Sequence, residues 1–212
     1  MLGREAEGTI VSTGSGNNLY GLKEGDRIVY LNESTYAEYT AANAAKAIKI
    51  PSNMEPTIAS AALLQGLTAL TLIRETHAVK KGDWVLVHAA AGGVGLWLCQ
   101  LLKAVGAKAI GTVSTSEKAE LAKKNGAEIV IESYDAETVK GKVMEVTGDK
   151  GVVAVFDGVG KATFDLSMDC LARKGTLASF GNASGAVPPL TVAYVLLLLT
   201  VFSARITNDE GF

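Results

Sequence analysis

Apolar positions follow two different patterns along the chain, and the change falls near residue 50. Before that point, short runs rich in β-branched and aromatic residues alternate with glycine-containing turns, which is typical of an antiparallel β domain. The strands predicted there are Thr9–Ser12, Arg27–Leu31, Tyr36–Thr40 and Ala47–Ile50. After Pro56, short apolar runs alternate with helical periodicity, which predicts a parallel sheet covered on both faces.

The second part of the chain predicts a doubly wound α/β sheet of five or six strands. Its strands are expected at Trp84–His88, Lys108–Val113, Glu128–Ile131, Val152–Phe156 and Thr176–Phe180, with a sixth within Val201–Ile206. Its helices are expected at Ile58–Ile73, Val94–Val105, Glu117–Asn125, Ala136–Thr147 and Lys161–Leu171. The glycines at positions 106, 126 and 148 are placed to end three of these helices. The predicted fold class is therefore an α/β Rossmann sheet joined to part of an antiparallel β domain.

Composition narrows the class of protein. Hydrophobic residues make up 48% of the 212 residues, which is enough for a packed core and argues against a disordered chain. The 20 Lys and Arg residues are balanced by 22 Asp and Glu residues, giving a net charge of −2. A protein that holds nucleic acid through phosphate contacts needs a basic face, so we expect no nucleic-acid partner.

Cysteine usage and the chain ends favour a cytoplasmic protein. Cys99 and Cys170 both lie within apolar runs, and we expect buried free thiols in a reducing compartment. The first ten residues lack the apolar core of a signal peptide. The apolar segment Leu190–Ala204 is 15 residues long, shorter than the roughly 20 that a spanning helix needs. A buried element or a subunit interface is the main interpretation of this segment, and a membrane span is the minor alternative.

A glycine-rich loop carries the clearest chemical signal. The segment from Ala89 to Gly95 (AAAGGVG) directly follows a predicted strand and opens a predicted helix. Glycines let backbone N–H groups approach a phosphate closely, and a helix N-terminus adds positive potential. The cofactor-binding residues predicted in this loop are Ala91, Gly92, Gly93, Val94 and Gly95. A tight turn without a ligand is the alternative.

The end of the second strand bears on the choice of cofactor. An NAD site usually carries an acidic residue there for the ribose 2′-hydroxyl, whereas this chain has Ser114. The Ser114 hydroxyl and the Lys118 ammonium suit a 2′-phosphate, so NADPH is predicted over NADH. Two alternatives stay open: Glu117 turns toward the ribose, or Lys118 is an ordinary solvated lysine.

The loops after the fourth and fifth strands lie at the same sheet edge, where open α/β sheets bind ligands. Gly158 belongs to the first loop, and Asn182 and Ser184 belong to the second. The latter two side chains have polar groups suited to a nicotinamide carboxamide, while ordinary turn chemistry is the alternative.

Several blocks together resemble the medium-chain dehydrogenase/reductase superfamily, in its zinc-independent quinone oxidoreductase branch. They are GREAEG from residue 3, GDRIVY from residue 25, QGLT from residue 65, HAAAGGVG from residue 88, GTV from residue 111 and SFGNASG from residue 179. The resemblance implies a partial GroES-like catalytic domain over residues 1–55 and an NADPH-binding Rossmann domain over residues 56–212. It places Thr68 and Phe180 near the nicotinamide, and Tyr134 near the adenosine 2′-phosphate with a shift of one residue.

The resemblance also implies an activity, which is hydride transfer from NADPH to a quinone. Arg4 stands where zinc-dependent relatives carry a histidine, and no cysteine precedes Cys99, so no metal is expected. An alkenal or enone double-bond reductase and a non-catalytic NADPH-binding protein are the alternatives. No catalytic acid stands out, because Tyr36 and Tyr39 are expected within the β domain. The family's opening strands and closing segment have no counterpart here, so we expect an incomplete catalytic domain, and the family resemblance favours a homodimer without a membrane partner.

Overall fold

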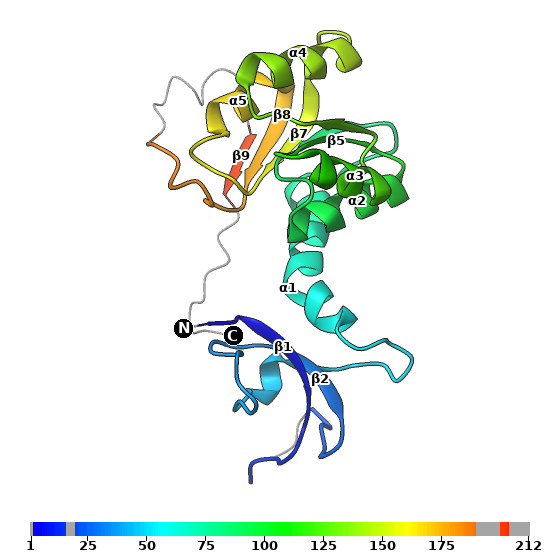
Figure 1. Cartoon of the computed structure of the whole chain (residues 1–212), viewed down its shortest axis with the longest axis vertical. Helices are drawn as coiled ribbons and strands as arrows, with labels where there is room; N and C mark the ends of the chain where they lie inside the picture. The colour runs from blue at the N-terminus through cyan, green and yellow to red at the C-terminus, as the bar shows by residue number, and fades with distance from the viewer. Residues whose placement is uncertain (1, 16–19, 190–199, 204–212) are drawn as a thin grey trace. The chain divides into compact units, whose positions relative to one another are not determined.

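A computed structural model describes all residues except 1, 16–19, 190–199 and 204–212 (Figure 1). The chain packs as two compact units, Met1–Thr68 and Ala69–Phe212, and each is described by itself. The domain boundary expected after residue 55 stays a prediction. Most of the apolar Leu190–Ala204 segment lies outside the described residues, apart from a short strand at Thr200–Ser203.

The first unit is built on a three-stranded antiparallel sheet. Its strands β1 (Glu5–Thr9), β2 (Arg27–Leu31) and β3 (Ala47–Lys49) lie in the order β1-β2-β3, and the short 3₁₀ turn η1 (Ala44–Lys46) leads into β3. Strand pairing alternates side chains between the two faces of the sheet. One face carries Val29, which packs with Ile50 against Ala59 and Leu63 of helix α1 (Ile58–Thr71).

Two of the strands expected in this unit were placed wrongly. The segment Tyr36–Thr40 forms no strand, because β2 already pairs with β1 on one side and with β3 on the other. The first strand is Glu5–Thr9 rather than Thr9–Ser12. The EAEGT sequence has weak β propensity, and pairing with the apolar β2 overrides that local preference.

The second unit contains a six-stranded, wholly parallel sheet in the order β6-β5-β4-β7-β8-β9. The strands are β4 (Trp84–Val87), β5 (Lys108–Thr112), β6 (Ile129–Ile131), β7 (Val152–Asp157), β8 (Leu171–Ser179) and β9 (Thr200–Ser203). The helices are α2 (Gly93–Val105), α3 (Ser116–Lys124), α4 (Ala136–Thr147) and α5 (Phe164–Asp169). The predicted doubly wound fold class is confirmed.

Helices cover both faces of this sheet, and the alternation along β4 shows it. Val85 and Val87 belong to a core with Leu98 of α2, whereas Leu86 belongs to a second core with Val139 of α4. Figure 1 shows α2 and α3 on one side of the sheet, with α4 and α5 toward the other. The π-helical turn η2 (Leu72–Thr76) continues α1 into the first of these cores.

The chain between β7 and β8 differs from expectation. Helix α5 is only Phe164–Asp169, because the residues before it form a turn that is bonded to the end of β7. Strand β8 begins earlier than expected, since Leu171 pairs with Val152 before a register shift. Lys174 takes a positive φ of 65° within that bulge. The local sequence pattern does not predict a β-bulge that results from pairing with a neighbouring strand.

The helix ends agree with the glycine positions. Gly106 and Gly148 adopt the left-handed conformation at the ends of α2 and α4, with φ of 81° and 60°. Gly126 follows α3 with φ of 109°. Across the described ranges, none of the helices combines the length and the hydropathy needed to cross a membrane.

Candidate functional site

The predicted phosphate loop joins the end of β4 to the start of α2. Gly92 is the residue before the helix, and it has no side chain to cap the helix end. The first turn of α2 carries no acidic residue, and the first N–H groups of any helix lack intrahelical partners. The N–H groups of Gly93, Val94 and Gly95 therefore form an open, electropositive end suited to an anion.

Two glycines serve packing around this loop rather than ligand contact. A Cβ on Gly95 would lie 2.4 Å from the Ala89 carbonyl oxygen, and a Cβ on Gly111 would lie 2.6 Å from the Ala90 Cβ. Ala90 is fully buried, and its N–H donates to the Thr112 carbonyl at 3.1 Å. Ala89 is held at φ of 51°. The loop is thus wedged between β5 and α2, which determines where the helix N-terminus points.

The residues predicted for the 2′-phosphate gather beyond the end of β5. Lys118 Nζ donates to Ser114 Oγ at 3.1 Å, and the Tyr134 hydroxyl approaches the Thr112 carbonyl at 3.5 Å. Burial raises the pKa of Tyr134, so its phenol stays a neutral donor. Thr115 caps α3 by accepting the Lys118 N–H at 3.3 Å. The side chains of Ser114 and Tyr134, from two loops, and of Lys118, from the first turn of α3, are therefore available at one sheet edge.

A buried histidine lies directly before the loop. His88 is 2% exposed, and its Nδ1 is hydrogen-bonded to Thr112 Oγ1 at 2.9 Å. Its Nε2 is buried and finds no hydrogen-bond partner among the described residues. Burial lowers the pKa of His88 to about 4, although the nearby Asp157 carboxylate opposes that shift. A neutral imidazole is the form that fits here, and His88 is the core residue that its strand position predicts.

Asp157 at the end of β7 is the buried polar residue that the sequence pattern did not single out. It is 1% exposed, and its oxygens accept from the N–H groups of Val159 and Gly160 at 2.8 and 3.0 Å. They also accept from the hydroxyls of Thr163 and Ser167 at 2.8 Å. A sequence signal for Asp157 was available. It is an aspartate that follows an apolar strand and precedes Gly-x-Gly, a pattern that suits an Asx-type turn.

The loops after β7 and β8 are hydrogen-bonded to each other and pack closely. The Ser184 hydroxyl donates to the Val159 carbonyl at 2.8 Å and accepts the Ala162 N–H at 2.9 Å. A Cβ on Gly158 would lie 2.8 Å from the Phe180 ring. Asn182 is exposed, and its carbonyl accepts the Gly185 N–H at 2.9 Å. Ser184 therefore serves the loop structure, while the Asn182 amide faces solvent.

Thr68 is the predicted site residue that comes first along the chain. It belongs to the first unit, and its hydroxyl donates to the Leu64 carbonyl at 2.7 Å within α1. Its expected place near a nicotinamide stays a prediction.

The two cysteines are free and buried, as expected. Burial raises the pKa of Cys99 to about 11 and that of Cys170 to about 12, so both remain unreactive thiols near neutral pH. Within the described part of the chain, no three His, Cys, Asp or Glu side chains lie together as a metal site would require.

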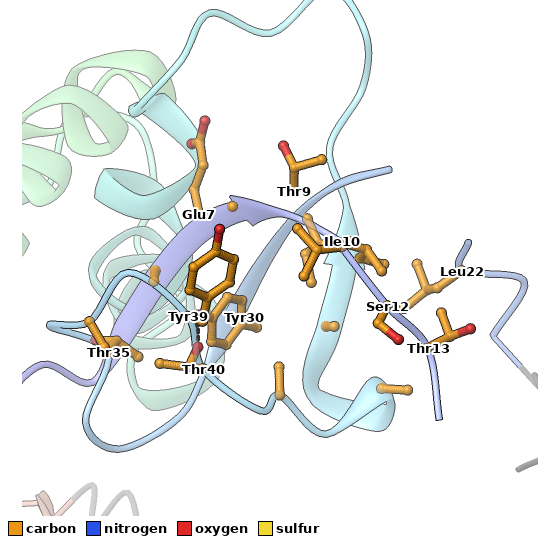
Figure 2. A pocket seen from close by; sticks show the side chains of 18 of the residues that line it. Glu7, Thr9, Ile10, Ser12, Thr13, Leu22, Tyr30, Thr35, Tyr39 and Thr40 are labelled. Carbon is orange, nitrogen blue, oxygen red and sulfur yellow. Dashed lines mark hydrogen bonds between the residues drawn. The ribbon is translucent and has the colours of Figure 1, made fainter. Parts of the chain in front are cut away.

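The first unit contains a cavity of about 960 Å³ beside β1. Figure 2 shows Glu7, Tyr39 and the Tyr30–Thr40 hydroxyl pair along its wall. Burial disfavours the charged form of Glu7, but the hydrogen bond and charge of Arg27 outweigh it, so the pKa of Glu7 is lowered. A carboxylate held in an ion pair is a poor proton donor, so Glu7 is not suited to act as a general acid.

Known proteins share this architecture. The family described as zinc-binding dehydrogenase matches residues 93–208. A probable quinone oxidoreductase of Schizosaccharomyces pombe is 46% identical over 194 residues, which are 91% of this chain and 58% of the relative.

Solved structures give the same result. A mycobacterial protein complexed with NADPH superposes with a TM-score of 0.87 at 44% identity, over 95% of this chain and 64% of that one. The Escherichia coli quinone oxidoreductase complexed with NADPH gives 0.82 at 41% identity, over 95% and 63%. The chain thus spans less than two thirds of each relative. It belongs to the zinc-binding dehydrogenase family, and the relatives named here that it resembles are quinone oxidoreductases.

Proposed function

We propose that this protein binds NADPH and transfers hydride from it to a quinone. The observation that carries the proposal is the uncapped N-terminus of α2 behind a glycine loop, with Ser114 and Lys118 joined at 3.1 Å beyond the next strand. An open helix end suits a pyrophosphate, and a lysine beside a hydroxyl suits a 2′-phosphate. Two structural relatives were solved with NADPH, which supports this choice of cofactor.

The residues that would hold the cofactor follow the edge of the sheet. The N–H groups of the loop from Ala91 to Gly95 would bind the pyrophosphate, and Ser114, Lys118 and Tyr134 would bind the 2′-phosphate. At Gly92 a Cβ would lie 3.1 Å from the Ala89 carbonyl oxygen, so glycine keeps this tight turn free of crowding before the helix N-terminus. Gly158, Phe180, Asn182 and Ser184 would border the nicotinamide, with Thr68 contributed by the first unit.

Bound NADPH would supply the hydride, and this chain would orient the cofactor and keep water from it. Arg4 occupies the position of a zinc-ligand histidine in related enzymes, so we propose hydride transfer without a metal. A quinone accepts hydride without a Lewis acid, whereas alcohol oxidation relies on a metal to polarise the oxygen.

The same proposal includes the domain boundaries, the cellular location and the oligomeric state of the protein. Residues 1–55 would belong to a GroES-like catalytic domain and residues 56–212 to the cofactor domain. The protein would work in the cytoplasm as a homodimer. Sedimentation velocity over a range of concentrations tests the dimer, and a monomer at every concentration would contradict it.

The test of the cofactor is a fluorescence titration of the full chain with NADPH and with NADH. We expect tighter binding of NADPH, and similar dissociation constants for the two would contradict the proposed role of Ser114 and Lys118. Acceptor-dependent NADPH oxidation is then compared between 1,2-naphthoquinone and an α,β-unsaturated aldehyde. Faster turnover of the aldehyde would identify a double-bond reductase, and binding without turnover of either would identify a non-catalytic NADPH-binding protein.

A further inference from the structure

The buried carboxylate of Asp157 lies at the end of β7, next to the point where the sheet order reverses between β4 and β7. In a doubly wound sheet the first half, here β4 to β6, holds the adenosine side of a dinucleotide. The other half of the dinucleotide then lies over the ends of β7 and β8. Asp157 therefore lies under the half of the proposed site where the reacting ring of the cofactor would be held.

The carboxylate shapes the loop that follows it. Its Oδ1 accepts the N–H groups of Val159 and Gly160, so the chain turns sharply directly after the strand. Its Oδ2 accepts the hydroxyls of Thr163 and Ser167, which tie the start of α5 to the same atoms. Four donors converge on one side chain that is 1% exposed. Hydrogen bonds to a charged acceptor in a buried site are among the stronger ones that a protein forms.

The loop shaped by Asp157 in turn holds the loop after β8. The Val159 carbonyl accepts both the N–H and the hydroxyl of Ser184, each at 2.8 Å. The Lys161 N–H donates to the Gly185 carbonyl at 3.1 Å. The two loops also touch where no side chain intervenes, since a Cβ on Gly181 would lie 2.6 Å from the Gly158 carbonyl oxygen. A displacement of the first loop must therefore displace the second.

We infer that Asp157 is a positioning residue for the nicotinamide half of the cofactor site, acting through the interlocked loops Gly158–Gly160 and Phe180–Gly185. This inference rests on the proposed binding of NADPH. The carboxylate oxygens of Asp157 already accept hydrogen bonds from protein donors, and the side chain is closed to solvent. Asp157 therefore holds the backbone in place and does not exchange protons with a substrate. The adenosine half would be bound at β4 to β6, whose loops accept or donate none of the hydrogen bonds of the Asp157 carboxylate.

The experiment separates the two halves of the ligand. Dissociation constants of NADPH and of 2′,5′-ADP, which lacks the nicotinamide, are measured by fluorescence and calorimetry for the full chain and for Asp157→Ala. We expect NADPH binding to weaken by about tenfold or more, because two loop amides lose a charged acceptor. Binding of 2′,5′-ADP should stay within about twofold, since its contacts lie on the β4–β6 side.

Two further variants keep the result interpretable. Asp157→Asn retains a carbonyl oxygen for the loop amides and an NH₂ group for the hydroxyl oxygens, so it should restore most of the NADPH affinity. Asp165→Ala removes an exposed aspartate from the same segment and should leave both ligands unaffected. Thermal unfolding of each variant checks that binding is measured on folded protein.

The outcomes are distinct. Equal loss of NADPH and 2′,5′-ADP in Asp157→Ala, or no loss of either, would overturn the positioning role while leaving the proposed function standing. Failure of the unaltered chain to bind either ligand would overturn the proposed function, and the inference with it.

Discussion

At the scale of single residues, Ser114 and Lys118 are hydrogen-bonded to each other at the place proposed for the 2′-phosphate. The lysine lies in the first turn of α3, so its side chain reaches back over the preceding loop to donate to Ser114 Oγ. Thr115 between them caps the helix and holds that turn in place. The ammonium group is thus directed toward the sheet edge, which would lower the entropy cost of the proposed binding of a phosphate.

Replacing Lys118 tests that role. In Lys118→Gln we expect the dissociation constant of NADPH to rise about tenfold while that of NADH barely changes, because a charged hydrogen bond to phosphate contributes about 1.5–3 kcal/mol. The measurement is a fluorescence titration with both nucleotides. Lys124→Gln, at the other end of the same helix, is the matched control. An equal rise for both nucleotides would show that Lys118 does not contact the 2′-phosphate.

At the scale of elements, the strand–loop–helix unit from β4 to α2 depends on close backbone approach. Gly95 is on α2, yet its importance comes from the Ala89 carbonyl in the loop, 2.4 Å from where a Cβ would be. Gly111 on β5 makes the same kind of room for Ala90. These contacts join three elements, so the loop cannot shift unless α2 moves away from the sheet.

A pair of glycine substitutions separates packing from helix propensity. Gly95→Ala should lower the free energy of unfolding by about 1–3 kcal/mol, because the new methyl group has no room beside a backbone oxygen. Gly141→Ala in α4, where nothing lies within 4 Å of the added Cβ, should instead raise it by about 0.5–1 kcal/mol through helix propensity. Chemical denaturation measures both. Equal effects of the two would show that close approach at Gly95 carries no cost.

At the scale of the whole molecule, one six-stranded parallel sheet and one three-stranded antiparallel sheet each carry apolar clusters on both faces. The described part of the larger unit contains two buried polar networks at the carboxyl ends of strands, one joining His88 to Thr112 and one around Asp157. Protonation of His88 couples to folding, because a buried imidazolium would have an N–H without a partner among the described residues.

Stability should therefore fall as the pH is lowered. The unfolded chain binds a proton on His88 near the ordinary pKa of 6.5, whereas the folded protein does so only near 4. The unfolded state thus holds more protons between these values, and the free energy of unfolding decreases as pH drops from about 6.5 to about 4. The part due to His88 approaches about 3 kcal/mol.

Denaturation curves at several pH values test this, with His88→Asn as the comparison because its amide keeps a partner for Thr112. The variant should be less stable at neutral pH but should show a flatter pH dependence in that window. His77, whose pKa is also lowered by burial, is present in both proteins and does not affect the difference. Parallel pH profiles for the two proteins would contradict the assignment.

The secondary structure predicted from the sequence was more accurate for the second unit than for the first. The order of strands and helices from Trp84 onward was predicted closely, and α4 was placed to the residue. The errors fell in the first unit and around α5, where Tyr36–Thr40 is no strand and β8 carries a bulge. In both places a contact with a distant strand outweighs the local preference of the residues.

For the site, the sequence determined the chemistry of the loop and of the sheet edge. The local features are glycines at fixed spacing, a serine in place of an acid and a nearby lysine. Hydrophobic periodicity predicts the strands, and residues that directly follow parallel strands lie at the carboxyl edge of the sheet. Only the tertiary structure decided that Gly111 makes room for Ala90 and that Val159 and Ser184 join the loops after β7 and β8. Each of these contacts joins residues 20 or more positions apart. The spacing of neighbouring side chains in the sequence does not encode such a contact.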